Sequence, residues 1–276
     1  MKITFIGGGN MASALISGLL KQGYATSQIG VVEINEESRT RIKEVFGITA
    51  AADLKNGIAP CGTGDADNVI VLAVKPQQLH ALTQLLAGLL DRHLVISIAA
   101  GIRTADIMRW LGGYKRIIRA MPNTPSLVGA GVTGLFAASD AAEQDRRIAE
   151  TIMKAVGSVL WVSEEEMLHT VTAISGSGPA YVFYFIESMQ QAAIELGLTQ
   201  NEARQLSLQT FQGAIKLANE SDDDAAVLRA RVTSRGGTTE QAIESMEVSE
   251  VKRRIIAAIH TANKRSREMS DEFGKL

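Results

Sequence analysis

The chain of 276 residues contains a single cysteine, Cys61. One cysteine cannot form an internal disulfide, and no histidine stands near it at the spacing of metal ligands. The sequence therefore predicts neither a disulfide framework nor a metal site. We expect an inert thiol, with a redox role as the alternative.

Long hydrophobic runs and an excess of basic charge are also missing. The longest apolar runs, such as residues 69–74 and 180–186, fall far short of the roughly 20 residues of a membrane-spanning helix. Lysine and arginine are scattered, the net charge is −2 and the pI is about 6.1, which gives no electrostatic case for nucleic acid. The N-terminus lacks the length and cleavage site of a signal peptide. We expect a cytoplasmic protein with no nucleic-acid or membrane partner.

Apolar residues, in contrast, make up 46% of the chain, enough for a buried core and, at this length, for two domains. Up to residue 162, helical patterns alternate with short strand-like runs at 3–6, 29–32, 69–74, 94–98, 116–119, 132–137 and 159–162. This alternation is typical of an α/β fold with a doubly wound parallel sheet. Helix starts are indicated by Asn10, by Pro76 and by a capping box of Asp140 with Glu143. We predict a Rossmann-type dinucleotide-binding domain at residues 1–162.

Residues 163–276 lack strand-like runs and consist of successive helical patterns. The helix signals are two capping boxes, a first-turn proline and a C-terminal glycine: Ser163 with Glu166, Thr199 with Glu202, Pro179 and Gly197. The pattern at 181–196 is apolar on more than one face, and burial against a second subunit explains it. We predict an all-helical C-terminal dimerisation domain that also binds substrate.

A glycine-rich turn follows the first predicted strand. Gly7, Gly9 and Ala12 form Gly-x-Gly-x-x-Ala in the strand–turn–helix context of the dinucleotide fingerprint. The turn lets a pyrophosphate approach the backbone, and the helix start offers free N–H groups and a partial positive charge. The predicted cofactor contacts here are Gly7, Gly8, Gly9, Asn10 and Met11. The alternative is an ordinary strand-to-helix turn.

Three later loops should lie at the same carboxyl edge of the sheet, where ligands bind in such folds. The predicted contacts in them are Ala73, Val74, Lys75 and Pro76, then Ala99, Ala100 and Gly101, and finally Asn123. Asn123 stands between two prolines and is the polar side chain expected to face the cofactor. For Lys75 a cofactor contact and a surface cation remain equal alternatives.

Glu33 ends the second predicted strand, about 20 residues beyond the glycines, where an acidic residue binds the adenosine ribose and repels a 2′-phosphate. Taken alone, Glu33 favours NAD. Asn35, Ser38 and Arg39 follow closely and could hold a phosphate, so the choice between NADPH and NADH stays open.

Two stretches rich in Gly, Ser and Thr, residues 175–181 and 233–239, each precede a helical pattern in the second half. Small residues let a ligand approach the backbone, and the first N–H groups of a helix can take an anion. We therefore predict a small anionic substrate. The alternatives are a close helix crossing for the first stretch and a plain inter-helix turn for the second.

Taken in order, these motifs closely resemble the pyrroline-5-carboxylate reductase family, and the match runs from end to end. The segments that carry it are residues 9–11, 73–76, 97–101, 119–125, 175–181 and 232–239. The last segment usually reads Ser-Pro-Gly-Gly-Thr-Thr in the family, whereas Arg235 replaces the proline here. Arg235 loosens the loop and adds a cation near a carboxylate site.

The resemblance implies hydride transfer from NADPH, with NADH possible, to C5 of 1-pyrroline-5-carboxylate, which gives L-proline. It implies substrate binding by Ser234, Gly236, Gly237, Thr238, Thr239 and Ser175. The Thr239 hydroxyl would donate a proton or orient the imine. A cyclic imine can arrive protonated, so the site needs no histidine, and core or surface roles are expected for His80, His93, His169 and His260. The resemblance also implies a homodimer through the helical domain, with a higher oligomer of dimers as an extension.

Two rival functions make different demands on the sequence. A β-hydroxyacid dehydrogenase would carry a catalytic lysine on the first long helix of its second domain, but residues 163–197 contain no lysine. A non-catalytic, dimeric NAD(P)H-sensing protein would not need the hydroxyl-rich stretch at 233–239. The reductase is the expected function.

Overall fold

The computed structural model describes residues 1–61, 68–138 and 141–276. They form two compact units: residues 1–177 with 262–276, and residues 178–261. The first unit thus extends beyond residue 162, where the sequence suggests a boundary. It does so because the helical segment after the last strand packs on the sheet, where Leu168 and Val171 lie against Gly134.

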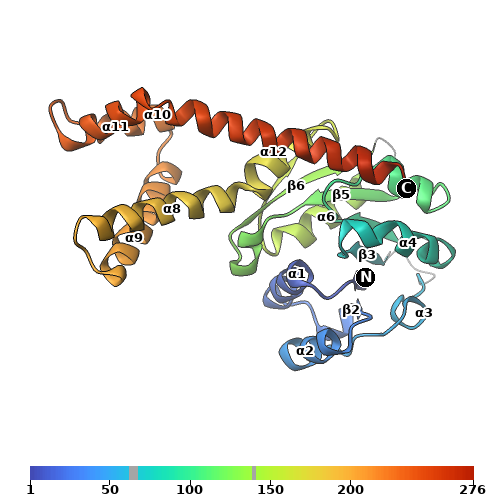
Figure 1. Ribbon diagram of the computed structural model, residues 1–276. Coiled ribbons are helices and arrows are strands. Elements are labelled where there is room, and N and C mark those ends of the chain that lie inside the picture. The colour runs from blue at the N-terminus through green and yellow to red at the C-terminus, as the bar shows by residue number, and fades with distance from the viewer. Residues whose placement is uncertain (62–67, 139–140) are drawn as a thin grey trace. The chain divides into compact units, whose positions relative to one another are not determined.

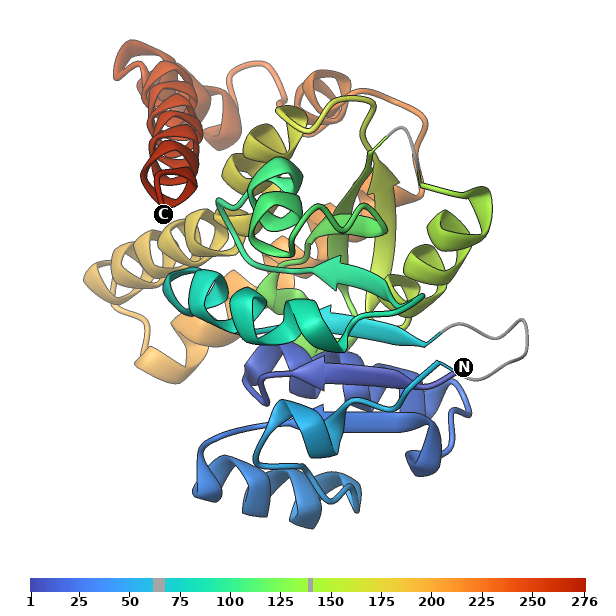
Figure 2. The ribbon, with the colours of Figure 1, turned by 90° about the vertical axis from the view of Figure 1, so that its right-hand side faces the viewer.

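The first unit contains a seven-stranded sheet in the order β2-β1-β3-β4-β5-β6-β7. The strands are β1 (Ile3–Ile6), β2 (Ile29–Val32), β3 (Val69–Leu72), β4 (Leu94–Ser97), β5 (Ile117–Met121), β6 (Gly131–Ala137) and β7 (Gly157–Trp161). They match the seven predicted runs. In Figure 2 the first strands, blue to teal, lie side by side and point the same way.

One pairing departs from the predicted parallel sheet, because β6 runs antiparallel to β5. The connection between them holds only a short 3₁₀ helix, η3 (Thr124–Val128). A parallel crossover needs a dozen or more residues, so this short link forces the chain to turn back. All other pairings are parallel, and the predicted α/β doubly wound fold class is confirmed in this mostly parallel form.

Helices cover both faces of the sheet (Figure 1). On one face α1 (Asn10–Lys21), α2 (Glu36–Phe46) and α6 (Glu143–Lys154) share a buried cluster with the strands. On the other face α4 (Pro76–Leu86) and α5 (Thr104–Trp110) share a second cluster. Burial on both faces explains why the strand sequences are continuous apolar runs. The smaller elements are η1 (Thr26–Gln28), α3 (Leu54–Gly57) and η2 (Ala87–Leu89).

Some predicted helix starts are confirmed, and one is wrong. Pro76 opens α4 as predicted. The capping box predicted for Asp140 lies outside the described residues. No capping box joins Ser163 and Glu166: α7 (Met167–Val171) begins with Glu166 as an N-cap that makes no side-chain capping bond. The Glu166 carboxylate instead accepts a hydrogen bond from Arg267. A tertiary contact therefore uses the carboxylate for which the sequence predicted a capping role.

A π-helical turn, η4 (Thr172–Gly176), follows α7 and completes this part of the first unit. The final residues of the chain also belong to this unit. There the end of α12 (Val251–Gly274) contacts α5, with Arg103 Nη2 2.7 Å from Asp271 Oδ1 and Arg109 Nη2 2.7 Å from the Gly274 carbonyl. These contacts fix the C-terminus of the chain on the sheet domain.

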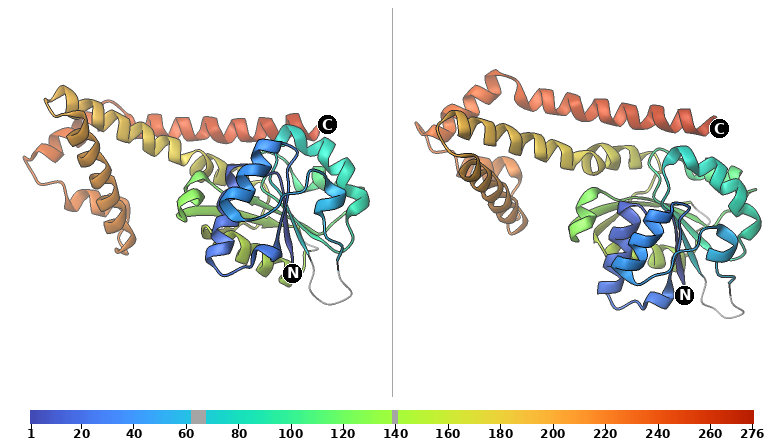
Figure 3. Two further views of the ribbon diagram at one scale, coloured as in Figure 1. Left: turned by 90° about the horizontal axis from the view of Figure 1, so that it is seen from below. Right: turned by 60° about the horizontal axis from the view of Figure 1, so that its bottom comes forward.

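The second unit is entirely helical, as predicted. It contains α8 (Gly178–Glu195), α9 (Gln200–Asn219), α10 (Ala225–Arg231), α11 (Thr238–Val248) and the first part of α12; Figure 3 gives two further views of these helices. The capping box of Thr199 and Glu202 is confirmed at the start of α9, and α8 ends before Gly197. In the described part of the chain, no helix is both long and apolar enough to cross a membrane.

Candidate active site

The glycine turn after β1 packs directly against the loop after β3. Gly7 adopts φ +101°, and its N–H donates to the Val32 carbonyl at 2.8 Å. A Cβ at Gly7 would lie 2.6 Å from the Ala73 carbonyl oxygen. Only glycine therefore fits both the backbone conformation and the close approach. The structure brings together two of the predicted cofactor loops.

The start of α1 is open to an anion. Gly9 is the N-cap residue, makes no side-chain capping bond, and has no atom within 4 Å of where a Cβ would stand. The first N–H groups of a helix lack internal acceptors, and the helix dipole adds partial positive charge there. This end of α1 can bind a phosphate group.

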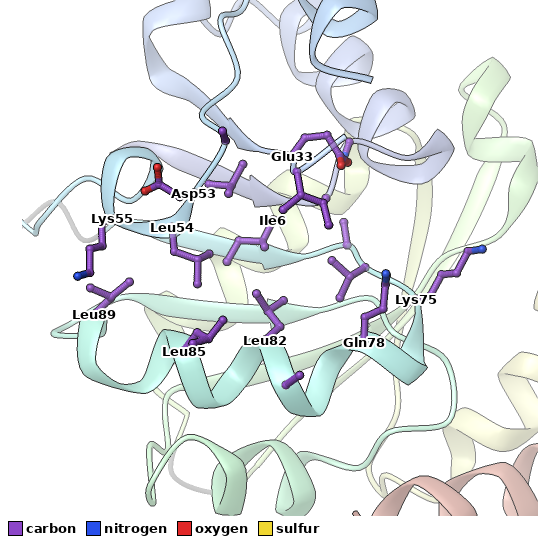
Figure 4. Close-up of a pocket in the computed structure, with 18 of the residues that line it drawn as sticks. Ile6, Glu33, Asp53, Leu54, Lys55, Lys75, Gln78, Leu82, Leu85 and Leu89 are labelled. Carbon is purple, nitrogen blue, oxygen red and sulfur yellow. The ribbon is translucent and has the colours of Figure 1, made fainter. Parts of the chain in front are cut away.

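A cleft of about 930 Å³ adjoins the glycine turn. Its wall is formed by the glycine turn, by Glu33 at the end of β2, by residues 52–55, by Ala73–Lys75 and by α4 with η2. Figure 4 shows Leu54 and Ile6 on one side of the hollow, with Leu82 and Leu85 on the other. An apolar hollow beside exposed N–H groups suits a nucleotide, whose base is flat and whose phosphates are charged.

The Glu33 carboxylate is fixed at the edge of this cleft. Its two oxygens accept the Gly8 and Asn35 backbone N–H groups, each at 2.8 Å. Arg39 donates from Nη1 to the Glu33 and Ile34 carbonyls, at 3.0 and 2.8 Å. The Arg39 guanidinium, which the sequence suggested as a phosphate ligand, is thus bonded to backbone carbonyl oxygens. Glu33 places a negative charge on the cleft wall.

Lys75 supplies a positive charge to the same cleft. It is the N-cap residue of α4 and lines the cleft next to Ala73 and Val74. Its amine has no hydrogen-bond or ion-pair partner within residues 1–61, 68–138 and 141–276. Its position therefore favours the cofactor contact over the ordinary surface cation.

The loop with Ala99, Ala100 and Gly101 follows β4 at the same sheet edge but does not line this cleft. The Ile98 N–H donates to the Leu72 carbonyl at 3.2 Å, so the loop starts beside the end of β3. Its other side is covered by α12, where a Cβ at Gly101 would lie 3.3 Å from Met269. The side of this loop that carries Gly101 is therefore packed against α12.

The Asn123 side chain links two backbone segments of the first unit. Its Oδ1 accepts the Val132 N–H at 2.9 Å, and its Nδ2 donates to the Ser175 carbonyl at 3.1 Å. Only 7% of the residue is exposed. One amide N–H is left for a ligand, so the predicted polar contact to the cofactor is reduced to a single donor.

The Ser175 stretch differs from the free helix start that the sequence suggested. Ser175 Oγ donates to the Val171 carbonyl at 2.9 Å, and the Ser177 N–H donates to the Thr172 carbonyl at 2.8 Å. The π-helical turn thus uses these groups internally. A Cβ at Gly176 would lie 2.8 Å from Met121 Cε, which favours the close-crossing alternative for this glycine.

The loop before α11, in the second unit, does present a free helix start. Gly237 is the N-cap residue of this helix and makes no side-chain capping bond. The Gly236 N–H donates to Glu240 Oε2 at 2.7 Å, and the Gly237 N–H donates to the Ser234 carbonyl at 3.0 Å. Four side chains here have no hydrogen-bond partner in the described chain: Ser234, Arg235, Thr238 and Thr239. Hydroxyls, a guanidinium and backbone N–H groups can together hold a carboxylate.

The histidines lie where the sequence placed them, outside the cleft wall. His93 and His169 are each 1% exposed, and His169 Nδ1 lies 2.8 Å from Ser266 Oγ. Burial lowers the pKa of His169 below its ordinary value, with nearby Arg119 acting in the same direction.

A buried ion pair near the Ala99 loop was not predicted. Arg119 Nη1 donates to Glu165 Oε1 at 3.0 Å, and Arg119 is only 2% exposed. Burial lowers the pKa of Arg119, while the Glu165 charge raises it. The sequence held one indication of this ion pair: Arg119 stands in an otherwise apolar strand, and a buried guanidinium requires a hydrogen-bond acceptor.

Known proteins resemble this chain over its whole length. A family model described as pyrroline-5-carboxylate reductase dimerisation matches residues 165–269, and one described as NADP oxidoreductase, coenzyme F420-dependent, matches residues 2–101. The pyrroline-5-carboxylate reductase of Pseudomonas aeruginosa is 40% identical, over 99% of this chain and 98% of that protein.

Two solved structures agree with this result. A pyrroline-5-carboxylate reductase from Coxiella burnetii has a TM-score of 0.88 and 44% identity, and covers 98% of each chain. A pyrroline carboxylate reductase from Plasmodium falciparum, with NADP bound, has a TM-score of 0.85 and 27% identity, again over 98% of each chain.

Proposed function

Because the chain belongs to the pyrroline-5-carboxylate reductase family, we propose that it reduces 1-pyrroline-5-carboxylate to L-proline with NADPH. The end-to-end similarity to these reductases carries the proposal. The free hydroxyls beside α11 and the N–H groups of its first turn support it, since a purely nucleotide-sensing protein has no use for a second anion site. The resemblance inferred from the motifs is confirmed at the level of the family.

The cleft beside the glycine turn is the proposed cofactor site. The N-terminus of α1 would hold the pyrophosphate, the leucine-lined hollow would take the adenine, and Lys75 would neutralise phosphate charge. NADPH is proposed because one matching family model is described as an NADP oxidoreductase and the Plasmodium falciparum protein has NADP bound. NADH is the second possible cofactor, because Glu33 favours a ribose without a phosphate.

The loop before α11 is the proposed substrate site. Ser234, the Thr238 hydroxyl and the first N–H groups of α11, at Thr238 and Thr239, would bind the ring carboxylate, and Arg235 would add charge attraction. The Gly236 and Gly237 N–H groups, which the resemblance assigned to this role, are already bonded to Glu240 and to the Ser234 carbonyl. Thr239 would direct its hydroxyl to the imine nitrogen. The bound cofactor supplies a hydride to C5 of the protonated imine. The protein orients the two reactants, and orientation alone can lower a barrier by roughly 7 to 11 kcal/mol.

We further propose that the protein works as a homodimer formed through its helical unit. The family model that matches residues 165–269 is a dimerisation domain. On α8 of this unit, Val182, Phe183 and Tyr184 are 44%, 66% and 69% exposed, which is unusual for large apolar side chains. A higher oligomer built from several such dimers is an extension of this proposal.

The direct test mixes purified protein with 1-pyrroline-5-carboxylate and follows the absorbance of NADPH and, in parallel, of NADH. Oxidation with proline as product is the expected result. Thr239→Val should lower kcat, and Thr239→Ser, which keeps the hydroxyl, should retain most of it. If both cofactors bind and neither is oxidised, the nucleotide-sensing dimer becomes the better description.

A further inference from the structure

One half-buried carboxylate, that of Glu165, joins three segments of the first unit that are distant in the sequence. Glu165 Oε1 accepts the Thr104 backbone N–H at 2.7 Å and Arg119 Nη1 at 3.0 Å. Its Oε2 accepts the Thr104 hydroxyl at 2.6 Å. Thr104 opens α5, Arg119 lies in β5, and Glu165 stands next to Glu166, the N-cap residue of α7. The two oxygens therefore tie the exit of the Ala99 loop to the sheet and to the segment that leads to Ser175.

We propose that Glu165 is a positioning residue for the reduction, acting through the loop of residues 98–103. This inference rests on the proposed function and on the predicted cofactor contacts of Ala99, Ala100 and Gly101, and it assigns the nicotinamide end of the cofactor to this loop, at the sheet edge beyond the cleft. Thr104 is the first residue after the loop, so its two bonds to Glu165 fix the loop's exit. The entry is fixed by β4, through the Ile98 N–H on the Leu72 carbonyl.

Contacts from α12 hold the underside of the same loop. A Cβ at Gly101 would lie 3.3 Å from Met269 and 3.5 Å from Phe273. Arg103 Nη2 lies 2.7 Å from Asp271 Oδ1. Contacts with α12 and the hydrogen bond of Ile98 to Leu72 fix one side and the start of the loop. The position of its end is then determined by the bonds of Thr104 to Glu165.

The form of this contact suits positioning better than simple helix capping. Helix starts are usually capped by a Ser, Thr, Asp or Asn at the N-cap itself. Here the N-cap is Arg103, which makes no side-chain capping bond, and the acceptor comes from 61 residues away. A buried ion pair adds little net stability over apolar packing, whereas its directed bonds fix geometry. Glu165 thus supplies a defined placement of the loop.

The test compares kcat, KM for NADPH and thermal stability in four variants with the unchanged protein. Glu165→Ala removes all three bonds. Glu165→Gln removes the charge but can keep the geometry, because its oxygen can accept two bonds and its NH₂ can donate to the Thr104 hydroxyl. Thr104→Val removes one bond and leaves the pair with Arg119 intact, while Thr104→Ser restores the hydroxyl.

Glu164→Gln serves as the matched control. Glu164 is the exposed neighbour of Glu165, and its carboxylate has no hydrogen-bond or ion-pair partner in the described chain. This substitution should leave kcat, KM and thermal stability unchanged.

The expected result is a fall in kcat of about tenfold to a hundredfold for Glu165→Ala, because a displacement near 1 Å can cost that much. KM for NADPH should change little, since the cleft binds the rest of the cofactor. Glu165→Gln should keep most of kcat. Thr104→Val should lower kcat by a smaller factor, and Thr104→Ser should restore it.

Three outcomes would overturn the inference. One is an unchanged kcat in folded Glu165→Ala, whatever its thermal stability. Another applies where Glu165→Ala does not fold because Arg119 is left unpaired. The comparison of Thr104→Val with Thr104→Ser then provides the test, and equal kcat values for these two variants would reject the inference. If the unchanged protein itself fails to oxidise NADPH with the imine, the proposed function fails, and the positioning role fails with it.

Discussion

Glu33 places a fixed negative charge beside the glycine turn, held by the N–H groups of Gly8 and Asn35. A 2′-phosphate in this part of the cleft would meet that charge, whereas a ribose hydroxyl could donate to it. We predict that Glu33→Gln raises the ratio of kcat/KM for NADPH to that for NADH by about tenfold, equivalent to roughly 1.4 kcal/mol. Initial rates with both nucleotides measure the ratio.

Glu36→Gln is the control for this change. Glu36 carries the same charge in the first turn of α2 but does not line the cleft. Its ratio should stay at the value of the unchanged protein. An equal shift in both variants would mean that net charge, and not the Glu33 site, sets the preference.

His169 makes the folded state sensitive to pH. Burial lowers its pKa below the ordinary 6.5, so between the folded and unfolded values the unfolded chain binds a proton that the folded chain lacks. Stability is therefore complete above about pH 6.5 and falls as the pH drops toward the folded pKa. Glu166 opposes the shift, while Arg119, Arg267 and Arg103 reinforce it.

We predict that His169→Asn flattens the dependence of the unfolding temperature on pH between about pH 7 and 5. Asparagine keeps a polar atom for Ser266 but does not titrate. His260→Asn, at an exposed position of α12, should keep the slope of the unchanged protein. A slope that survives in His169→Asn would assign the effect to another group.

Among the secondary-structure elements, α1 lies very close to the segment that joins α6 to β7. A Cβ at Gly18 would lie 2.4 Å from the Ala155 carbonyl oxygen and 2.8 Å from Val156 Cγ1. In an open helix, Gly→Ala stabilises by about 1 kcal/mol. Here the added methyl group meets backbone, so we predict that Gly18→Ala destabilises the protein by about 1 to 3 kcal/mol.

Chemical denaturation measures both this change and its control, Gly213→Ala. Gly213 lies within α9 and has no atom within 4 Å of an added Cβ. The same substitution should raise the free energy of unfolding there by about 1 kcal/mol. Opposite signs for the two variants are the expected result; a stabilising Gly18→Ala would show that the contact relaxes freely.

The elements themselves were largely readable from the sequence, because β-branched runs bounded by glycines report burial on two faces. The direction of β6 was not, since an apolar run looks the same in either direction and only the short link at η3 decides it. Glu165 was missed for a related reason. Its partners stand 61 and 46 residues away, beyond any local pattern.

The site shows the same division. For Gly7 and Gly9 the strand–turn–helix context predicts a close turn with room for a cofactor, and the structure shows the close approach of Gly7 to Ala73. For Asn123 and Ser175 the residue types were suggestive, but the side chains bond to the protein itself. A polar residue near a site can bind either a ligand or the protein's own backbone, and the sequence alone does not distinguish these two roles.

For the whole molecule, self-association follows from the apolar side chains that the helical unit leaves uncovered. Phe183 on α8 is 66% exposed, and burying a phenylalanine contributes about 1.5 to 3 kcal/mol. A twofold interface contains each residue twice, so Phe183→Glu acts at two places. We predict that this variant converts the proposed dimer to a monomer in size-exclusion chromatography with light scattering.

Val45→Glu is the matched control, since Val45 is 64% exposed on α2, outside the helical unit. It should leave the dimer intact. If Phe183→Glu is a folded monomer that binds NADPH but no longer turns over, the partner subunit completes the active site. A fully active monomer would instead place the whole site within one chain, and would remove the dimer from the mechanism.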